Sequence, residues 1–204
     1  MVNTLKVAMY NFDEAIFNDV YKELAETKTF FEIFRDAYIP LLNFIGLLWQ
    51  SKSLTPAHEH FISNLIYQKI QINTEKIDFK NTAKDKVFVL YLPEDEIHEL
   101  GLLYLNYELK LKGYKTIYLG QNVPLKNLDD LQKVFSKICF ISYFLVEPSE
   151  DKIIPYLNNA AELMKNTANK LWVVGKKAHQ KKGENTSKKI TIFEDTLSVL
   201  KEFK

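Results

Sequence analysis

The chain has 204 residues, of which 47% are hydrophobic, and this is enough for one large or two small hydrophobic cores. Its 27 Lys and Arg residues nearly balance its 26 Asp and Glu residues, which argues against a chain-wide basic field for binding nucleic acid. No apolar run reaches the roughly 20 residues of a membrane span, and the N-terminus lacks a signal-peptide pattern. Cys139 is the single cysteine, so an intrachain disulfide is excluded. A cytoplasmic protein without a membrane partner is expected.

Residues 1–72 contain no convincing strand and predict a small helical bundle. Pro40 lies inside the second helical pattern and predicts a kink or break there. Thr55 and Pro56 suit the N-cap and first position of the third helix. The predicted helices cover residues 11–26, with Asn11 or Asp13 at the start, 29–50 and 53–72.

Residues 73–86 are polar and unpatterned, as expected of a linker. After it, short apolar runs alternate with amphipathic stretches. This alternation predicts a flavodoxin-like, doubly wound sheet of five parallel strands over residues 87–204, so the fold class is α/β behind a helical bundle. The predicted strands are 87–92, 115–120, 137–142, 170–175 and 190–193, and the predicted helices are 98–113, 124–135, 150–166 and 195–203.

His98 follows the first predicted strand in the string Glu-Asp-Glu-Ile-His-Glu-Leu-Gly, where open α/β sheets keep their ligand sites. A neutral imidazole is a good transition-metal ligand, and a carboxylate on its other nitrogen fixes the tautomer. Glu96 is placed to supply that carboxylate. Gly101 lets another group approach the start of the next helix closely. From this string alone, a solvated loop histidine is an equally available interpretation.

The three strings Glu-Ile-His-Glu-Leu-Gly, Gly-Tyr-Lys-Thr-Ile-Tyr-Leu-Gly-Gln-Asn-Val-Pro and Ile-Ser-Tyr-Phe fall at strand ends. Together they resemble the cobalamin-binding domain shared by methionine synthase and corrinoid proteins. The resemblance implies that His98 is the lower ligand of cobalt and that Glu96 is its hydrogen-bonding partner. It also implies that the benzimidazole tail of the cofactor leaves the cobalt and runs down into the sheet.

The same resemblance assigns further residues to the nucleotide tail. Ser142 matches the serine of a Ser-x-Leu motif that lines the tail channel, and Ser149 is near a serine that bonds the Asp or Glu. Gly175 matches the first of two glycines that leave room for the tail. The chain departs from the pattern at Phe144, which replaces the leucine, and at Lys176, which replaces the second glycine and could obstruct the tail or turn to solvent.

In the helical half, Trp49 is followed after nine residues by Glu59 and His60. An acid on an otherwise apolar helical stripe calls for a partner, although Glu59 also suits a helix N-terminus and Trp49 an ordinary core. The spacing resembles the cobalamin-binding regions of MerR-type transcriptional regulators, including light-responsive carotenoid-gene repressors. The resemblance implies that these residues shape the pocket of an adenosyl or methyl upper ligand.

These patterns predict a cobalamin-sensing regulatory module, not an enzyme, with adenosylcobalamin or methylcobalamin as cofactor between the bundle and the sheet. A homo-oligomer is expected, with DNA contacted only through a DNA-binding domain absent from this chain. One alternative is a corrinoid carrier for methyltransferases. Another is a regulator of the same fold that has lost its cofactor.

Overall fold

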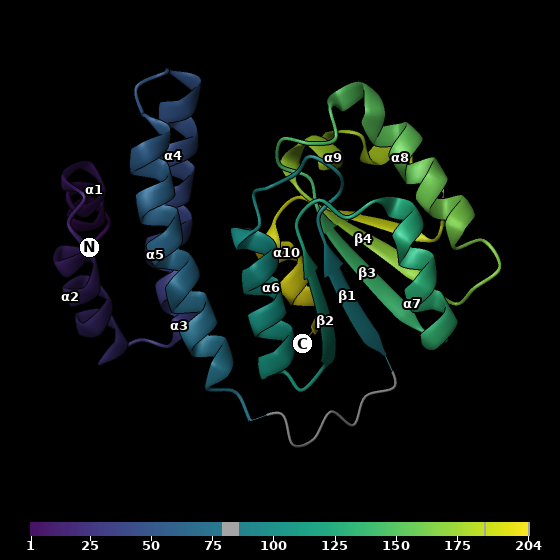
Figure 1. The fold of residues 1–204 in the computed structure, drawn as a ribbon, viewed down its shortest axis with the longest axis horizontal. Helices are drawn as coiled ribbons and strands as arrows, with labels where there is room; N and C mark the ends of the chain where they lie inside the picture. The colour runs from purple at the N-terminus through teal and green to yellow at the C-terminus, as the bar shows by residue number, and fades with distance from the viewer. Residues whose placement is uncertain (79–85, 186, 204) are drawn as a thin grey trace. The chain divides into compact units, whose positions relative to one another are not determined.

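The structure is a computed structural model that describes residues 1–78, 86–185 and 187–203. The chain divides into two compact units, Met1–Asn73 and Thr74–Lys204 (Figure 1). Part of the expected linker, residues 79–85, lies outside the described residues.

The first unit is helical, as the sequence predicted, but it begins with a helix that the sequence analysis missed. That helix, α1, ends at Asn11, and Phe12 follows in the left-handed region with φ 51°. Asp13 then caps α2, since its side chain accepts a hydrogen bond from the backbone of Ile16 at 3.0 Å. The helices are α1 (Val2–Asn11), α2 (Glu14–Ala25), α3 (Phe30–Ile33), α4 (Ile39–Gln50) and α5 (Pro56–Glu75).

Pro40 has the predicted effect on helix geometry. A π-helical turn, Phe34–Tyr38, separates α3 from α4, and Pro40 lies in the first turn of α4. Proline lacks an N–H and its ring crowds the carbonyl four residues earlier, so the chain cannot keep regular α-helical bonding across it. The wider π turn accommodates this change without ending the helical run.

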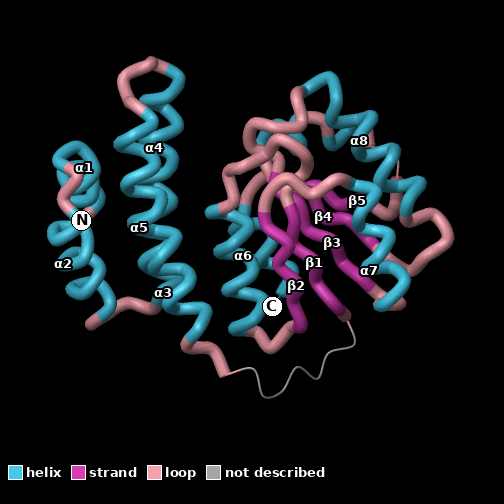
Figure 2. Tube along the Cα trace, viewed as in Figure 1, coloured by secondary structure: helices cyan, strands magenta, loops and turns pink. Residues whose placement is uncertain are grey.

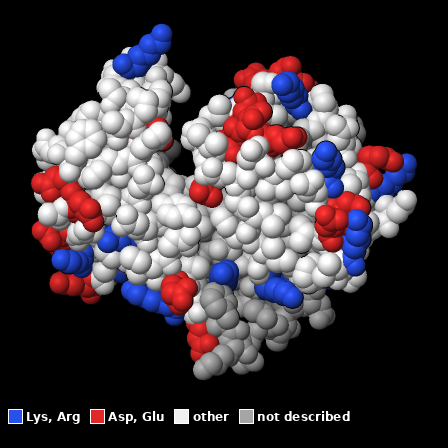
Figure 3. All heavy atoms as spheres, viewed as in Figure 1, with Lys and Arg blue, Asp and Glu red and all other residues white. Residues whose placement is uncertain are grey.

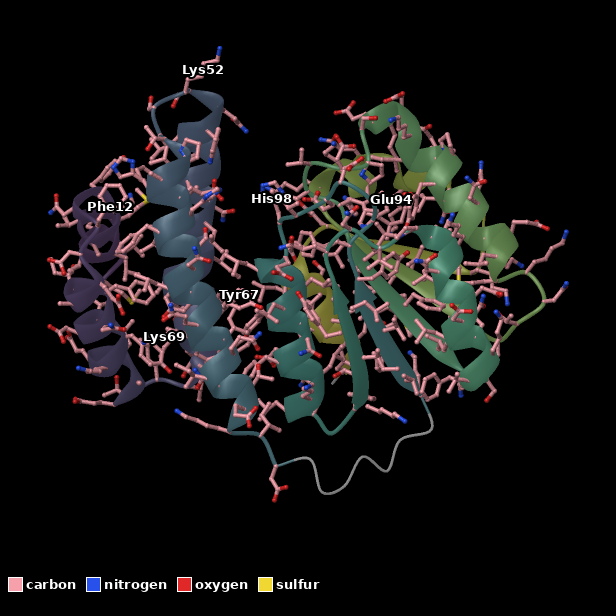
Figure 4. The ribbon with its side chains drawn as sticks, in the orientation of Figure 1. Phe12, Lys52, Tyr67, Lys69, Glu94 and His98 are labelled. Carbon is pink, nitrogen blue, oxygen red and sulfur yellow. The ribbon has the colours of Figure 1, made fainter. Side chains whose placement is uncertain are left out.

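Aromatic stacking and long-range polar contacts hold the first unit together. Phe17 on α2 stacks on Tyr38 with ring centroids 5.9 Å apart, and both side chains are buried. Lys69 on α5 donates to Oδ1 of Asn18 at 2.6 Å and lies 4.9 Å from the ring centroid of Tyr21 (Figure 4). These contacts tie α5 to α2.

The second unit is built on one parallel sheet with strand order β2-β1-β3-β4-β5 (Figure 2). This order confirms the predicted flavodoxin-like, doubly wound arrangement. The strands are β1 (Val87–Tyr91), β2 (Lys115–Gly120), β3 (Ile138–Tyr143), β4 (Lys170–Val174) and β5 (Ile190–Phe193). The helices are α6 (Leu100–Leu111), α7 (Asp129–Val134), α8 (Glu150–Leu163), α9 (Lys176–Gln180) and α10 (Thr196–Leu200).

Both faces of this sheet are covered, which explains why its strands read as continuous apolar runs. On one face, α7 and α8 pack over alternate strand residues such as Val89 and Phe140. On the other face, α6 and α10 pack over Leu90 and Ile141. The crossovers bring the carboxyl ends of the strands to one edge, and the loop that carries His98 lies at that edge (Figure 4).

Charged side chains of both signs are interspersed on the visible face of each unit (Figure 3), in keeping with a formal net charge of +1. Within the described ranges, no helix combines the length and the apolar character needed to cross a membrane.

Candidate functional site: a histidine held by a buried carboxylate

The loop after β1 folds around the carboxylate of Glu96. One carboxylate oxygen, Oε1, accepts three hydrogen bonds from the chain that follows it. The donors are the backbone N–H of Ile97 at 2.9 Å, the backbone N–H of His98 at 3.0 Å and Nδ1 of the His98 ring at 2.6 Å. The short spacing between Glu96 and His98 therefore produces a compact turn in which the carboxylate grips the imidazole.

The other oxygen of Glu96, Oε2, joins this loop to the loop that follows β3. It accepts hydrogen bonds from the backbone N–H groups of Leu145 at 3.1 Å, Val146 at 2.6 Å and Glu147 at 2.9 Å. The carboxylate is completely buried. Five backbone donors and one imidazole therefore satisfy a charge that would otherwise be costly to bury.

This arrangement fixes the protonation of the Glu96 carboxylate and of one ring nitrogen of His98. Burial acts to raise the pKa of Glu96, but the hydrogen bonds from His98 and from the backbone of His98, Val146 and Glu147 outweigh it and lower the pKa to about 2. Glu96 is therefore a carboxylate at neutral pH and can only accept. The ring nitrogen Nδ1 of His98 must then carry the hydrogen, which leaves the lone pair of the neutral imidazole on Nε2, the atom that binds a metal.

Lys177 braces the loop that holds Glu96. Its ammonium donates to the carbonyl oxygen of Val146 at 2.5 Å and to that of Pro148 at 3.3 Å. The N–H groups of this loop donate to Glu96, and two of the loop's carbonyl oxygens accept from Lys177. Lys177 lies on α9, a short helix that the sequence analysis did not predict.

The loop after β2 supports the same turn from its other side. The amide oxygen of Asn122 accepts from the backbone N–H of Asp95 at 3.1 Å, and both residues have positive φ, 56° and 65°. Glu99 accepts from the hydroxyl of Tyr118 at 2.6 Å and from the amide of Gln121 at 2.9 Å. Contacts from the strand ends on either side of β1 therefore position His98.

Three apolar side chains near the histidine are unusually exposed. Ile97 is 57% exposed, Leu145 50% and Val146 51%. Their backbone N–H groups all bond to Glu96, so these side chains lie on the two loops that meet at that carboxylate. An exposed apolar group of this kind beside a polar anchor is typical of a ligand platform. The sequence analysis missed it, although the pair Leu145-Val146 directly after a strand end was a usable signal.

The resemblance placed Ser142 in the tail channel and Ser149 near a serine that bonds the acid of the histidine loop. Ser142 is buried in β3 beside Tyr91, and its hydroxyl lacks a hydrogen-bond partner of normal geometry among the described residues. Ser149 directly precedes α8 and hydrogen-bonds the carboxylate of Asp151, whose pKa it lowers. The bonds that Glu96 receives across the sheet edge come from backbone N–H groups, which a sequence pattern does not display.

The two glycines predicted to belong to the site, Gly101 and Gly175, each have a close neighbour. A Cβ at Gly101 would lie 2.8 Å from a ring carbon of Tyr143. A Cβ at Gly175 would lie 2.2 Å from the carbonyl oxygen of Phe144, and φ at Gly175 is 137°, so only glycine fits there. Lys176 is exposed, so it follows the second of the two possibilities considered for it and turns to solvent.

The structure brings the helical motif residues together. Nε1 of Trp49 at the end of α4 donates to Oε2 of Glu59 in the first turns of α5, at 3.1 Å. Nε2 of His60 lies 3.9 Å from the same oxygen. Glu59 is largely covered, while Trp49 is 43% exposed. Thr55 lies directly before α5, and its hydroxyl bonds Nδ1 of His58 at 2.7 Å.

Comparisons with known proteins show what the chain is similar to. Residues 1–72 match the family model of the B12 binding domain. The chain is also 27% identical over 125 residues to the HTH-type transcriptional repressor CarH of Myxococcus xanthus, a stretch that covers 61% of this chain and 41% of the repressor. The chain therefore spans less than half of the curated relative that it matches.

A solved structure shares the fold across nearly the whole chain. The monomethylamine corrinoid protein of Methanosarcina barkeri superposes with a TM-score of 0.78, covering 97% of this chain and 94% of that protein at 15% sequence identity. These findings confirm the predicted resemblance to cobalamin-binding proteins and support binding of a corrinoid.

The residues present fit the lower ligand of a corrinoid but not an inserted tail. A neutral imidazole with a carboxylate on its second nitrogen is the donor that cobalt needs, and apolar side chains flank it. By contrast, the ring of Tyr143 lies against Gly101, and the backbone of Phe144 lies against Gly175, the glycine assigned to the tail.

Replacing Glu96 with Gln should lower the unfolding free energy at neutral pH by on the order of 3 kcal/mol, because an amide cannot accept from donors on both sides. Since the carboxyl pKa falls from 4.5 to about 2 on folding, its contribution is present above pH 4.5 and is lost as the pH falls through this range. Urea denaturation from neutral to acidic pH measures this. Glu99→Gln is the matched control: Glu99 also accepts on both oxygens, but it is only partly buried, so its replacement should cost no more than about 1 kcal/mol. Equal losses of unfolding free energy in the two variants, or a loss that persists below pH 2, would contradict this role of the Glu96 carboxylate.

Replacing Gly175 with Ala should cost more than about 3 kcal/mol, because the new Cβ would overlap the carbonyl of Phe144 at a φ that L-residues rarely adopt. Gly183→Ala is the control, since a Cβ there meets nothing within 4 Å and should change stability by less than about 0.5 kcal/mol. Thermal unfolding of both variants checks the pair. A Gly175→Ala variant as stable as the parent would show that β3 and β4 do not approach so closely.

Proposed function

We propose that this chain binds a corrinoid through His98 and acts as the cobalamin-sensing module of a MerR-type transcriptional regulator. The observation that carries the proposal is the hydrogen bond between Nδ1 of His98 and the buried carboxylate of Glu96. It sets the tautomer with the lone pair on Nε2 and strengthens that nitrogen as a ligand. A bound corrinoid supplies a cobalt centre with an exchangeable upper ligand, adenosyl or methyl in this proposal.

The chain's own residues have three tasks in this function. His98 donates its lone pair to cobalt, and Glu96 holds the ring without taking its proton, because the pKa of Glu96 is about 2. Ile97, Leu145 and Val146 offer apolar contact to the rim of a flat macrocycle and exclude water from it.

Trp49 and Glu59 support the regulatory role over the alternative. Their side chains are joined at 3.1 Å, and the indole remains 43% exposed, so a rigid aromatic surface is available to a ligand. We assign this surface, with His60, to the upper face of the corrinoid, where it discriminates between upper ligands. A corrinoid carrier for methyltransferases is the alternative function, but it has to offer its upper face to partner enzymes, and a tryptophan there hinders access.

Regulation then follows by population shift. A bound corrinoid favours the conformation of the chain that it binds more tightly, in proportion to its difference in affinity between conformations. We propose that this shift changes the assembly of a homo-oligomer, and that DNA is bound through a separate domain. The likeness to the Myxococcus xanthus repressor over 125 residues supports this assignment.

Replacing His98 with Ala should abolish imidazole ligation and weaken corrinoid binding by about tenfold or more. Aquacobinamide is the suitable probe, because it lacks the nucleotide base that could itself supply a lower nitrogen. The visible spectrum during titration reports the change from water to nitrogen on cobalt. His179→Ala is the control and should behave as the parent does. The proposal fails if the His98 variant gives the same spectrum and affinity as the parent.

Replacing Trp49 with Phe should change the ratio of affinities for adenosylcobalamin and methylcobalamin by about threefold or more, because the ring loses its bond to Glu59 and its fixed position. Binding of aquacobinamide with nitrogen on cobalt should survive. Leu47, which is 63% exposed on the same helix, offers the control Leu47→Ala. If the ratio is the same in the parent and in both variants, Trp49 does not face the upper ligand.

A further inference from the structure

The ring of Tyr143 fills the space beside Gly101. Ring carbons Cε2 and Cζ of Tyr143 lie 2.8 Å and 3.1 Å from the place where a Cβ of Gly101 would be. The hydroxyl of Tyr143 accepts a bond from Thr196 at 3.5 Å, and burial raises the pKa of the phenol, which stays neutral. The ring therefore lies between the start of α6 and the start of α10, over the end of β3.

The opposite face of β3 is filled in the same way around Ser142. The hydroxyls of Tyr91 and Tyr156 are hydrogen-bonded at 2.9 Å, and the ring of Phe144 meets that of Tyr156 edge-on with centroids 5.2 Å apart. Tyr91 and Phe144 are completely buried. Aromatic rings of the chain thus occupy the surroundings of Ser142 on that face.

These packed rings conflict with an inserted nucleotide. The resemblance has the tail leave cobalt at His98 and run down into the sheet beside β3. On the face of β3 that carries Ser142 it would meet Tyr91, Phe144 and Tyr156, and on the face against Gly101 it would meet Tyr143. A benzimidazole is a flat bicyclic group larger than a tyrosine ring, so it cannot share the space that Tyr143 fills. Moving a packed aromatic side chain out of its site would weaken binding, because its buried contacts are lost.

We propose that this chain takes corrinoids with no nucleotide beside β3: the macrocycle and its cobalt bind at His98, and Tyr143 occupies the place of the tail. This rests on the proposed function, because it presupposes a corrinoid at His98. The ligand class is that of corrinoids lacking the lower nucleotide, of which cobinamide is the simplest. A complete cobalamin binds only with its nucleotide left outside the fold.

The test compares aquacobinamide with aquacobalamin on the full chain, by titration followed in the visible spectrum. The parent should bind cobinamide at least as tightly as cobalamin. In Tyr143→Ala the emptied space should admit the nucleotide, so affinity for cobalamin should rise about tenfold while that for cobinamide changes by less than about threefold. Tyr143→Phe keeps the ring and should behave as the parent does.

Three results would overturn the inference. The first is a parent that binds cobalamin about tenfold or more tightly than cobinamide, a result that needs no variant to fold. The second is an unchanged ratio of affinities in Tyr143→Ala, or in Tyr143→Leu if the alanine variant unfolds. The third is binding of neither corrinoid by the parent, which removes the proposed function as well and so differs from the first two, in which a corrinoid still binds.

Discussion

A single buried carboxylate organises the proposed ligand site. Glu96 receives bonds from its own turn on one oxygen and from the loop after β3 on the other. Without those donors, burial would drive the group to its neutral form; with them, the pKa is about 2 and the charge is stable. The same carboxylate therefore joins two strand ends and sets the tautomer of His98. Structure and proposed chemistry depend on one interaction.

The rest of the sheet edge follows from that anchor. Drawing the loop after β3 onto Glu96 leaves Leu145 and Val146 directed outward beside the histidine, half exposed. Lys177 then donates hydrogen bonds to the carbonyl oxygens of Val146 and Pro148 in that loop. The one-residue alternation of β3 sends Ser142 and Tyr143 to opposite faces, so the tyrosine lies against Gly101. The edge therefore carries exposed apolar side chains beside the histidine and packed aromatic rings below, an arrangement that suits the proposed corrinoid.

Much of the fold could be predicted from the sequence because its signals are local. Apolar runs of strand length that alternate with helical patterns predicted a doubly wound sheet of five parallel strands, and Asp13 and Pro40 acted as expected. The pairing of Glu96 with His98 was also predictable, since the two lie close in sequence. The first helix was missed, because Met1 precedes it without a capping side chain to mark its start.

What the sequence did not predict depends on contacts between distant residues. The donors of Leu145, Val146 and Glu147 to Glu96 are backbone groups, and every residue carries such a group. The fit of Tyr143 against Gly101 requires knowing which face of β3 each residue takes and how close α6 lies. Lys176 drew suspicion as an obstruction because it replaces a small residue, yet it is exposed.

The central claim is that a histidine of this chain, held by Glu96, supplies the nitrogen below cobalt. Electron paramagnetic resonance of the bound cob(II)inamide, with protein labelled at histidine by nitrogen-15, tests it most directly, since that corrinoid brings no nucleotide nitrogen of its own. The account predicts that the nitrogen splitting changes from a triplet in unlabelled protein to a doublet in labelled protein, and that the splitting disappears in His98→Ala. A spectrum without nitrogen splitting, or one that keeps its triplet after labelling, would contradict it.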